Sequence, residues 1–200
     1  MTFSTMLQPT NTKERIILGI DPGTKVMGYG LVKEIGTKTE LISLGVVKMD
    51  KIDDHMLKLQ RIFEKTLALI DNYKPDCLAI EAPFYGKNIQ VMLKLGRAQG
   101  VAMAAALSRN VEVTEYSPRK IKQSITGNGN ATKEQVAAML QTLLKFQETP
   151  DFLDATDGLA VAVCHSFQKF PATKAGSSKS GKKSYSGWDT FVKDNAKRIV

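Results

Sequence analysis

Four acidic residues stand at positions from which their carboxylates could act together. Asp21 and Glu81 each end a short apolar run typical of a buried strand, and Asp154 and Asp157 lie in the first turns of the last expected helix. The spacing of three between Asp154 and Asp157 places both carboxylates on one helix face. Because ligand sites in open α/β sheets gather beyond the strand ends, we expect all four side chains to meet at one edge of a sheet.

Such a group of carboxylates favours metal-assisted chemistry. Converging carboxylates repel one another unless a cation lies between them. Hard oxygen ligands suit Mg²⁺, for which Mn²⁺ can substitute, with waters and phosphate oxygens completing the coordination shell. Two such ions can activate a water molecule and stabilise the leaving oxygen in phosphodiester hydrolysis. We therefore expect one or two ions in this site.

Each acid also has a purely structural explanation. Asp21 precedes Pro-Gly and could be a turn residue, and Glu81 could cap the loop that follows it. Asp154 and Asp157 could be first-turn residues favoured by the helix dipole. Asp157 is the hardest to explain in this way, because it leads directly into the apolar run GLAVAV. An acid that borders a buried face needs a partner.

Basic residues gather on both sides of a GNGN loop at 127–130. They are Arg119, Lys120, Lys122 and Lys133. Such a set can neutralise phosphates and bind DNA with an affinity that depends on salt. A solvated basic face is the alternative explanation.

The elements that must position these side chains follow from apolar periodicity and turn signals. A capping box of Thr132 and Gln135 marks one helix start, and Thr149 with Pro150 marks another. We expect an α/β fold with a mixed five-stranded sheet flanked by helices. The expected strands are 15–20, 28–33, 40–48, 77–80 and 111–116, and the expected helices are 55–72, 88–109, 118–125, 133 to about 146, and 150 to about 170.

The chain of 200 residues suits one such domain with a proper core. We expect a flexible leader at 1–14, the α/β domain at 15–170 and a flexible basic linker at 171–187, which is rich in Gly, Ser and Lys. The last segment, 188–200, regains apolar residues and could dock as a short helix.

Charge and hydropathy narrow the partners and the compartment. The net charge of +8 makes a polyanionic partner plausible. Cys77 and Cys164 lie in apolar runs, which predicts buried, reduced thiols. No apolar run approaches the roughly 18 residues of a membrane span, and the polar start at 1–14 lacks a signal-peptide core. We therefore expect a cytoplasmic protein without membrane contact.

Four segments of the chain resemble, in order and spacing, the motifs of the RuvC family of Holliday junction resolvases. They are IILGIDPGTKVMGYGLV (16–32), AIEAPFYGKNIQVMLKLGRAQGVAMAA (79–105), EYSPRKIKQSITGNGNATKEQV (115–136) and DATDGLAVAVCH (154–165). The resemblance covers about residues 15–167. Four motifs in order are far more specific than any one of them.

This resemblance implies an RNase H-like (retroviral-integrase-like) nuclease domain, a homodimer, and Mg²⁺-dependent paired nicks across four-way junction DNA in recombination and repair. It also implies cooperation with a branch-migration motor. By motif, the catalytic and metal-binding carboxylates are Asp21, Glu81, Asp154 and Asp157. The family's aromatic residue falls on Phe84, and its DNA-contacting lysines fall on Lys122 and Lys133.

Three further features bear on this interpretation. Phe84 could stack on an unpaired base at the junction centre, or it could be a core residue. The helix expected at 88–109 is rich in Gly and Ala, which permits close packing against a second copy or against its own sheet. Gly158 stands where family members usually carry alanine. That departure costs helix propensity of roughly 1 kcal/mol and removes no functional group.

Three other functions compete with junction resolution. Asp21-Pro-Gly-Thr with Gly28 resembles the first phosphate loop of actin-like and sugar-kinase ATPases. Those proteins duplicate the domain, however, and this chain is too short for two. A smaller RNase H-like nuclease acting on RNA would lack the aromatic at Phe84 and the small-residue helix. A non-catalytic DNA-binding module would not require four carboxylates at one edge.

Overall fold

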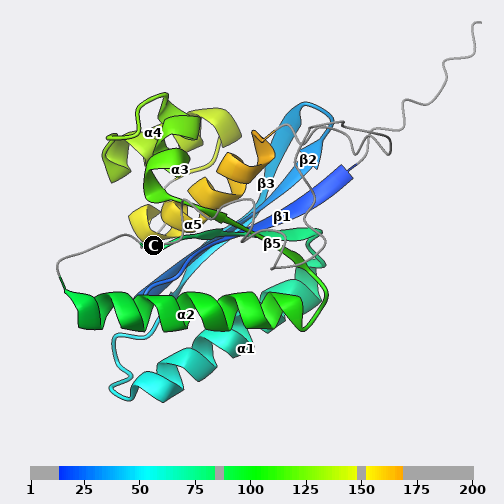
Figure 1. Cartoon of the computed structure of the whole chain (residues 1–200). Coiled ribbons are helices and arrows are strands. Elements are labelled where there is room, and N and C mark those ends of the chain that lie inside the picture. The colour runs from blue at the N-terminus through cyan, green and yellow to red at the C-terminus, as the bar shows by residue number, and fades with distance from the viewer. Residues whose placement is uncertain (1–13, 84–87, 148–151, 169–200) are drawn as a thin grey trace, which may run out of the picture. The chain divides into compact units, whose positions relative to one another are not determined.

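A computed structural model describes residues 14–83, 88–147 and 152–168 of the chain. Five strands and five helices follow one another in these ranges (Figure 1). In chain order they are β1 (Glu14–Asp21), β2 (Val26–Ile35), β3 (Lys38–Lys48), α1 (His55–Tyr73), β4 (Cys77–Glu81), α2 (Ile89–Leu107), β5 (Glu112–Tyr116), α3 (Pro118–Thr126), α4 (Lys133–Leu144) and α5 (Phe152–Ser166).

The strands form one mixed sheet in the order β3-β2-β1-β4-β5. The first three strands make an antiparallel meander. β4 and β5 then join parallel to β1, with Ile20 opposite Ile80 and Glu81 opposite Tyr116. This confirms the mixed five-stranded sheet expected from the sequence. Because β1 and β4 are parallel neighbours, their carboxyl ends lie at the same edge.

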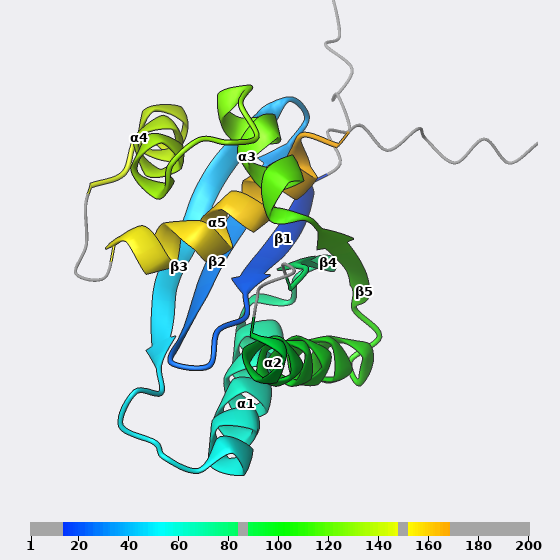
Figure 2. The same cartoon turned by 60° about the vertical axis from the view of Figure 1, so that its left-hand side comes forward.

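Helices cover both faces of the sheet (Figures 1 and 2). α1 and α2 lie on one face, while α3, α4 and α5 lie on the other. Each face has its own apolar cluster, and the alternating residues of β1 serve both: Ile17 points to the α5 side and Leu18 to the α1 side. Both side chains are fully buried. The sheet is therefore the middle of three layers.

The expected element bounds agree with the structure to within a few residues. α4 ends at Leu144, two residues early, because Lys145 adopts a left-handed conformation with φ 54°. The capping box of Thr132 and Gln135 is present. α5 ends at Ser166 rather than near residue 170. The expected cap at Thr149 and Pro150 lies outside the described residues, as do the leader up to 13 and the tail from 169.

Both cysteines are buried free thiols, as expected. His165, in the last turn of α5, joins this core: its Nε2 lies 3.2 Å from Cys77 Sγ and its Nδ1 lies 3.0 Å from Tyr116 Oη. Burial lowers the pKa of His165 to about 4, so the ring is neutral at physiological pH. These contacts tie α5 to β4 and β5. None of the helices that the structure describes is long and apolar enough to cross a membrane.

Candidate active site

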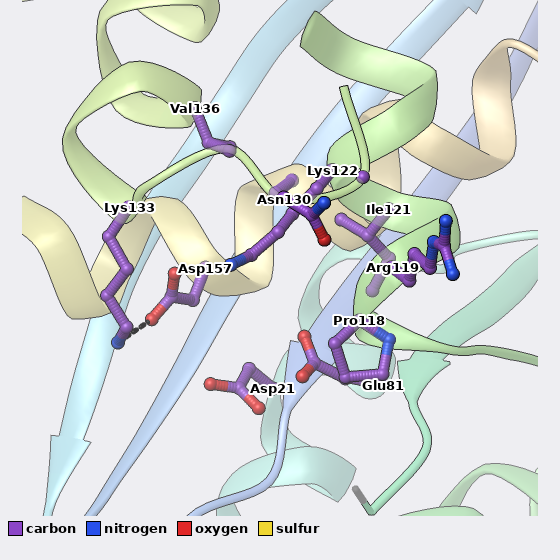
Figure 3. A pocket seen from close by; sticks show the side chains of 12 residues that line it. Asp21, Glu81, Pro118, Arg119, Ile121, Lys122, Asn130, Lys133, Val136 and Asp157 are labelled. Carbon is purple, nitrogen blue, oxygen red and sulfur yellow. Dashed lines mark hydrogen bonds and ion pairs between the residues drawn. The ribbon is translucent and has the colours of Figure 1, made fainter. Parts of the chain in front are cut away.

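Asp21 and Glu81 lie side by side where β1 and β4 end (Figure 3). The strands stop there for local reasons: Pro22 follows Asp21 and cannot donate to the β-ladder, and Ala82 with Pro83 follows Glu81. Both acids are half-buried. Their placement confirms that the two strand-ending carboxylates share one sheet edge.

α5 carries the other two acids and lies unusually close to the sheet. A Cβ atom at Gly28 would come within 2.1 Å of the Asp154 carbonyl oxygen, and one at Gly30 would come within 2.4 Å of Leu159 Cα. A Cβ at Gly158 would meet the Tyr29 backbone at 2.5 Å. Glycines on both surfaces thus let the backbones touch, which sets Asp154 and Asp157 beside the end of β1.

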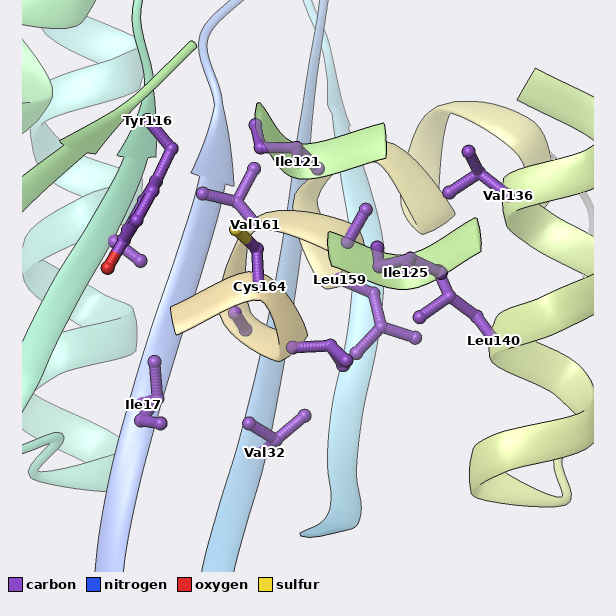
Figure 4. Close-up of a cluster of buried hydrophobic side chains, with 14 of the residues drawn as sticks. Ile17, Val32, Tyr116, Ile121, Ile125, Val136, Leu140, Leu159, Val161 and Cys164 are labelled. Atoms are coloured by element: carbon purple, nitrogen blue, oxygen red, sulfur yellow. The ribbon is translucent and has the colours of Figure 1, made fainter. Parts of the chain in front are cut away.

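Gly158 therefore has a role that helix propensity alone does not reveal. The sequence suggested only a cost of roughly 1 kcal/mol in helix stability. In the structure the missing side chain permits the contact with β2. The rest of α5 is held by apolar packing: Leu159, Val161 and Cys164 are almost completely buried (Figure 4).

Lys133 brings a positive charge to the acids from the first turn of α4. Its Nζ lies 2.5 Å from Asp157 Oδ2 (Figure 3). The same Nζ lies 3.7 Å from Asp154 Oδ1. Asp157 lies at the edge of a buried helix face, where an acid needs a partner. Lys133 is that partner. Asp154 is the more exposed of the two acids on α5.

Asp21, Glu81, Asp157 and Lys133 line a cavity of about 650 Å³ between the sheet edge and the α3–α4 segment. Of the predicted site residues, the cavity brings together Asp21, Glu81, Asp157, Arg119, Lys122 and Lys133. Lys120 is exposed on α3 and does not line the cavity. Asp154 does not line it either, but its carboxylate lies 3.7 Å from Lys133, which does. Phe84 lies outside the described residues.

Burial and mutual repulsion raise the pKa of the acids that line the cavity. Burial raises the pKa of Glu81 to about 8, and the charges of Asp21 and Asp157 add to this, while Lys133 and Lys122 oppose it. The pKa of Asp21 is raised to about 6, first by burial and then by repulsion from Asp157. The carboxyl groups of the cavity thus repel one another despite the lysines beside them.

The mutual repulsion of the carboxyl groups and their all-oxygen donor set fit a divalent cation. As the side chains stand, no three acidic, His or Cys side chains of the described residues form a ready group around one point. Lys133 occupies the space beside Asp157 instead.

Two residues with polar side chains near the acids were not predicted. Asn130 lines the cavity, and Gln99 of α2 donates from Nε2 to Glu115 Oε2 at 2.7 Å and to the Glu81 carbonyl oxygen at 3.4 Å. The only sequence signal for Asn130 was its place in the GNGN loop between basic residues. Gln99 interrupts a helix face of small residues, which is a weak hint of a polar buried contact.

Comparison with known proteins identifies the family to which this chain belongs. Residues 17–165 match the family model for crossover junction endodeoxyribonuclease RuvC. The chain belongs to the RuvC family. It is 61% identical over 186 residues to the RuvC of Christiangramia forsetii, covering 93% of each chain, and 55% identical over 196 residues to that of Bacteroides fragilis, covering 97% of this chain and all of the relative.

A solved RuvC structure supports the same assignment. The Thermus thermophilus RuvC in complex with a Holliday junction substrate is 32% identical and superposes with a TM-score of 0.70, covering 76% of this chain and 93% of the other. The fold is thus the RNase H-like fold of the RuvC family, as expected. RuvC proteins are metal-dependent nucleases, which agrees with the carboxylates at the sheet edge.

Proposed function

We propose that the chain resolves four-way (Holliday) DNA junctions by hydrolysing phosphodiester bonds, with paired symmetric nicks, in recombination and repair. The observation that carries this proposal is the convergence of Asp21, Glu81 and Asp157 with Lys122 and Lys133 in one cavity. Acids and lysines are needed together, because a nuclease must bind a polyanion and still concentrate carboxylates beside its phosphate. The junction bound to the Thermus thermophilus relative supports the choice of substrate.

The same proposal assigns Mg²⁺, or Mn²⁺ as a substitute, to the four carboxylates, with one or two ions in each site. A bound ion of this kind activates water and stabilises the leaving oxygen. The ion would be bound by Asp21, Glu81 and Asp157, which line the cavity, and by Asp154, which lies beside it. The high pKa of Glu81 means that its proton must leave before it can serve as a ligand.

The basic residues have separate tasks. Lys122 and Arg119 bind phosphates from the α3 side of the cavity. Lys133 can exchange its contact with Asp157 for a contact with the incoming phosphate, which frees the carboxylate. Lys120, outside the cavity, contacts DNA further from the cut. Phe84 stacks on a base opened at the crossover, a role that rests on the motif alone.

We further propose a homodimer formed through α2. One face of this helix is largely exposed and made of apolar or small residues. They are the exposed Ile89, Leu93, Gly100, Ala104 and Leu107 and the half-buried Gly96. A Cβ at Gly96 or Gly100 would meet nothing within 4 Å, so both positions are open to a partner helix. A two-fold dimer would present two sites to a two-fold junction. The branch-migration motor remains a proposed partner by resemblance.

A substrate panel tests the proposed function. The chain is incubated with labelled four-way junction, linear duplex of the same sequence, RNA and ATP, each with and without Mg²⁺. Symmetric nicking of the junction alone, and only with the metal, is the expected result. Preferential cleavage of RNA, or ATP hydrolysis without DNA cleavage, would contradict the proposal.

A further inference from the structure

The loop between α3 and α4 presents a polar side chain that the proposed chemistry does not use. Asn130 is the only uncharged polar side chain among the residues that line the cavity, where the other polar side chains are three acids and three bases. Its carboxamide faces the cavity (Figure 3). In the part of the chain that the structure describes, no hydrogen bond engages this carboxamide; only the backbone N–H is bonded, to Asn128 Oδ1 at 3.0 Å.

Hydrogen bonds and packing position the backbone on both sides of Asn130, whose own side chain is exposed. Gln123 ties the loop to α3 by donating to the Gly127 carbonyl oxygen at 2.6 Å and accepting from the Gly129 N–H at 3.0 Å. On the other side of Asn130, Ala131 is buried. A Cβ at Gly129 would lie 2.7 Å from Arg119 Cγ, so the loop packs directly on α3. A ligand that bonds to Asn130 therefore meets a side chain on ordered backbone, which lowers the entropy lost on binding.

A neutral amide in this position contributes to the specificity of DNA binding more than to its affinity. Three cations already line the cavity, and an uncharged group adds little to the affinity for phosphate. An Asn side chain instead presents one donor and one acceptor at a spacing that matches the edge of a base, adenine best. Asn130 lines the same cavity as Asp21 and Glu81, so a strand whose scissile phosphate lay beside these acids could bring an adjoining nucleotide to its carboxamide.

We propose that Asn130 is a specificity-determining residue whose carboxamide hydrogen-bonds the edge of a base beside the scissile phosphate and so selects the sequence at which the junction is cut. This inference rests on the proposed function, because it presumes a DNA strand in the cavity. It assigns sequence selection to the α3–α4 loop and leaves catalysis to the acids.

The test compares cleavage rates over four-way junctions that differ only in the base pairs at the crossover. The unaltered protein should cut some steps faster than others. Asn130→Ala should lose roughly 5- to 150-fold in rate at the preferred steps, the range that one base contact confers, and change little at the poor ones. Asn130→Asp, which keeps the shape and replaces the donor by an acceptor, should change the order of preference.

Lys122→Gln is the matched control, because it removes a phosphate contact from the same cavity and should slow cleavage equally at all sequences. An Asn130→Ala profile parallel to that of the unaltered protein would overturn the inference, as would equal rates at every step for the unaltered protein. Absence of cleavage of every junction by the unaltered protein would overturn the proposed function itself and this inference with it.

Discussion

At the scale of single residues, the acids that line the cavity have raised pKa values, so they bind a proton more readily than exposed acids do. The pKa of Glu81 is raised to about 8 by burial and by the charges of Asp21 and Asp157. In the metal-free protein the folded state therefore binds this proton more tightly than the unfolded state does. Stability should fall as the pH rises from the ordinary value of 4.5 toward 8. His165 acts in the opposite direction, but only below its ordinary pKa of 6.5.

The first prediction uses the window above pH 6.5, where Glu81 dominates. The melting temperature of the metal-free protein should fall between pH 6.5 and about 8.5, and Mg²⁺ should restore it more strongly at the higher pH. Glu81→Gln should flatten this fall and melt several degrees higher at pH 8, since about 1 kcal/mol corresponds to roughly 2–4 °C in a domain of this size. Calorimetry with exposed Glu112→Gln as control measures it. Identical pH slopes for all three proteins would contradict the account.

Asp21 and Glu81 could be predicted because each is a local signal, an acid that ends an apolar strand. The contact between Lys133 and Asp157 could not, because it depends on how α4 docks on α5, and no local pattern encodes that docking. The position of Asn130 in the cavity could not be predicted for the same reason. A polar loop residue acquires a role only when the loop is seen to face the acids.

At the scale of elements, the approach of α5 to the sheet decides where the acids on α5 lie. The second prediction is that Gly30→Ala destabilises the fold by about 1–3 kcal/mol, the usual cost of overpacking. Its methyl group would lie 2.4 Å from Leu159 Cα, so the helix must move outward. Junction cleavage should fall with it, because Asp157 moves away from Asp21. Chemical denaturation and cleavage rates measure both effects. Unchanged stability would show that the helix is not held by this contact.

The third prediction tests the exposed face of α2. Gly100→Glu should leave folding intact or improve it, because no atom lies within 4 Å of the new Cβ and glutamate is the better helix former. Dimer formation should weaken by at least about 10-fold, since a charge would be buried without a partner. Sedimentation across a wide concentration range measures this, with Lys94→Ala on the flank of the helix as control. Association equal to that of the unaltered protein would place the dimer elsewhere, and a protein that is monomeric throughout would exclude it.

The helices and strands were largely predictable because their apolar periods are long and regular. α1 begins and ends almost as expected, with Asp54 as its N-cap. The end of α4 at Leu144 differed because it depends on Lys145, a left-handed residue that carries no Gly or Asn signal. The close contact between α5 and β2 was not predictable, because glycines in a strand occur for several reasons. Only the structure shows that the strand glycines and Gly158 face each other across this contact.

At the scale of the whole molecule, the charge is unevenly distributed along the sequence. Residues 171–200 carry seven basic and two acidic residues, which is five of the net charge of +8. The fourth prediction is that a chain ending at Phe170 binds junctions more weakly at low salt and with a shallower salt dependence, because fewer counterions are released. Cleavage at saturating protein should survive. An unchanged salt slope would show that this segment does not contact DNA.

The central claim is that Asp21, Glu81, Asp154 and Asp157 cut DNA with a metal and do not hold the junction. The most direct test measures cleavage and junction affinity together for Asp157→Asn in Mg²⁺. Cleavage should fall by more than about 100-fold, since even indirect partners of a metal are worth about 10–100-fold. Affinity should be unchanged or higher, because a negative charge facing phosphate is lost. Asp71→Asn, outside the cavity, should behave as the unaltered protein. Cleavage by Asp157→Asn at the rate of the unaltered protein would contradict the account.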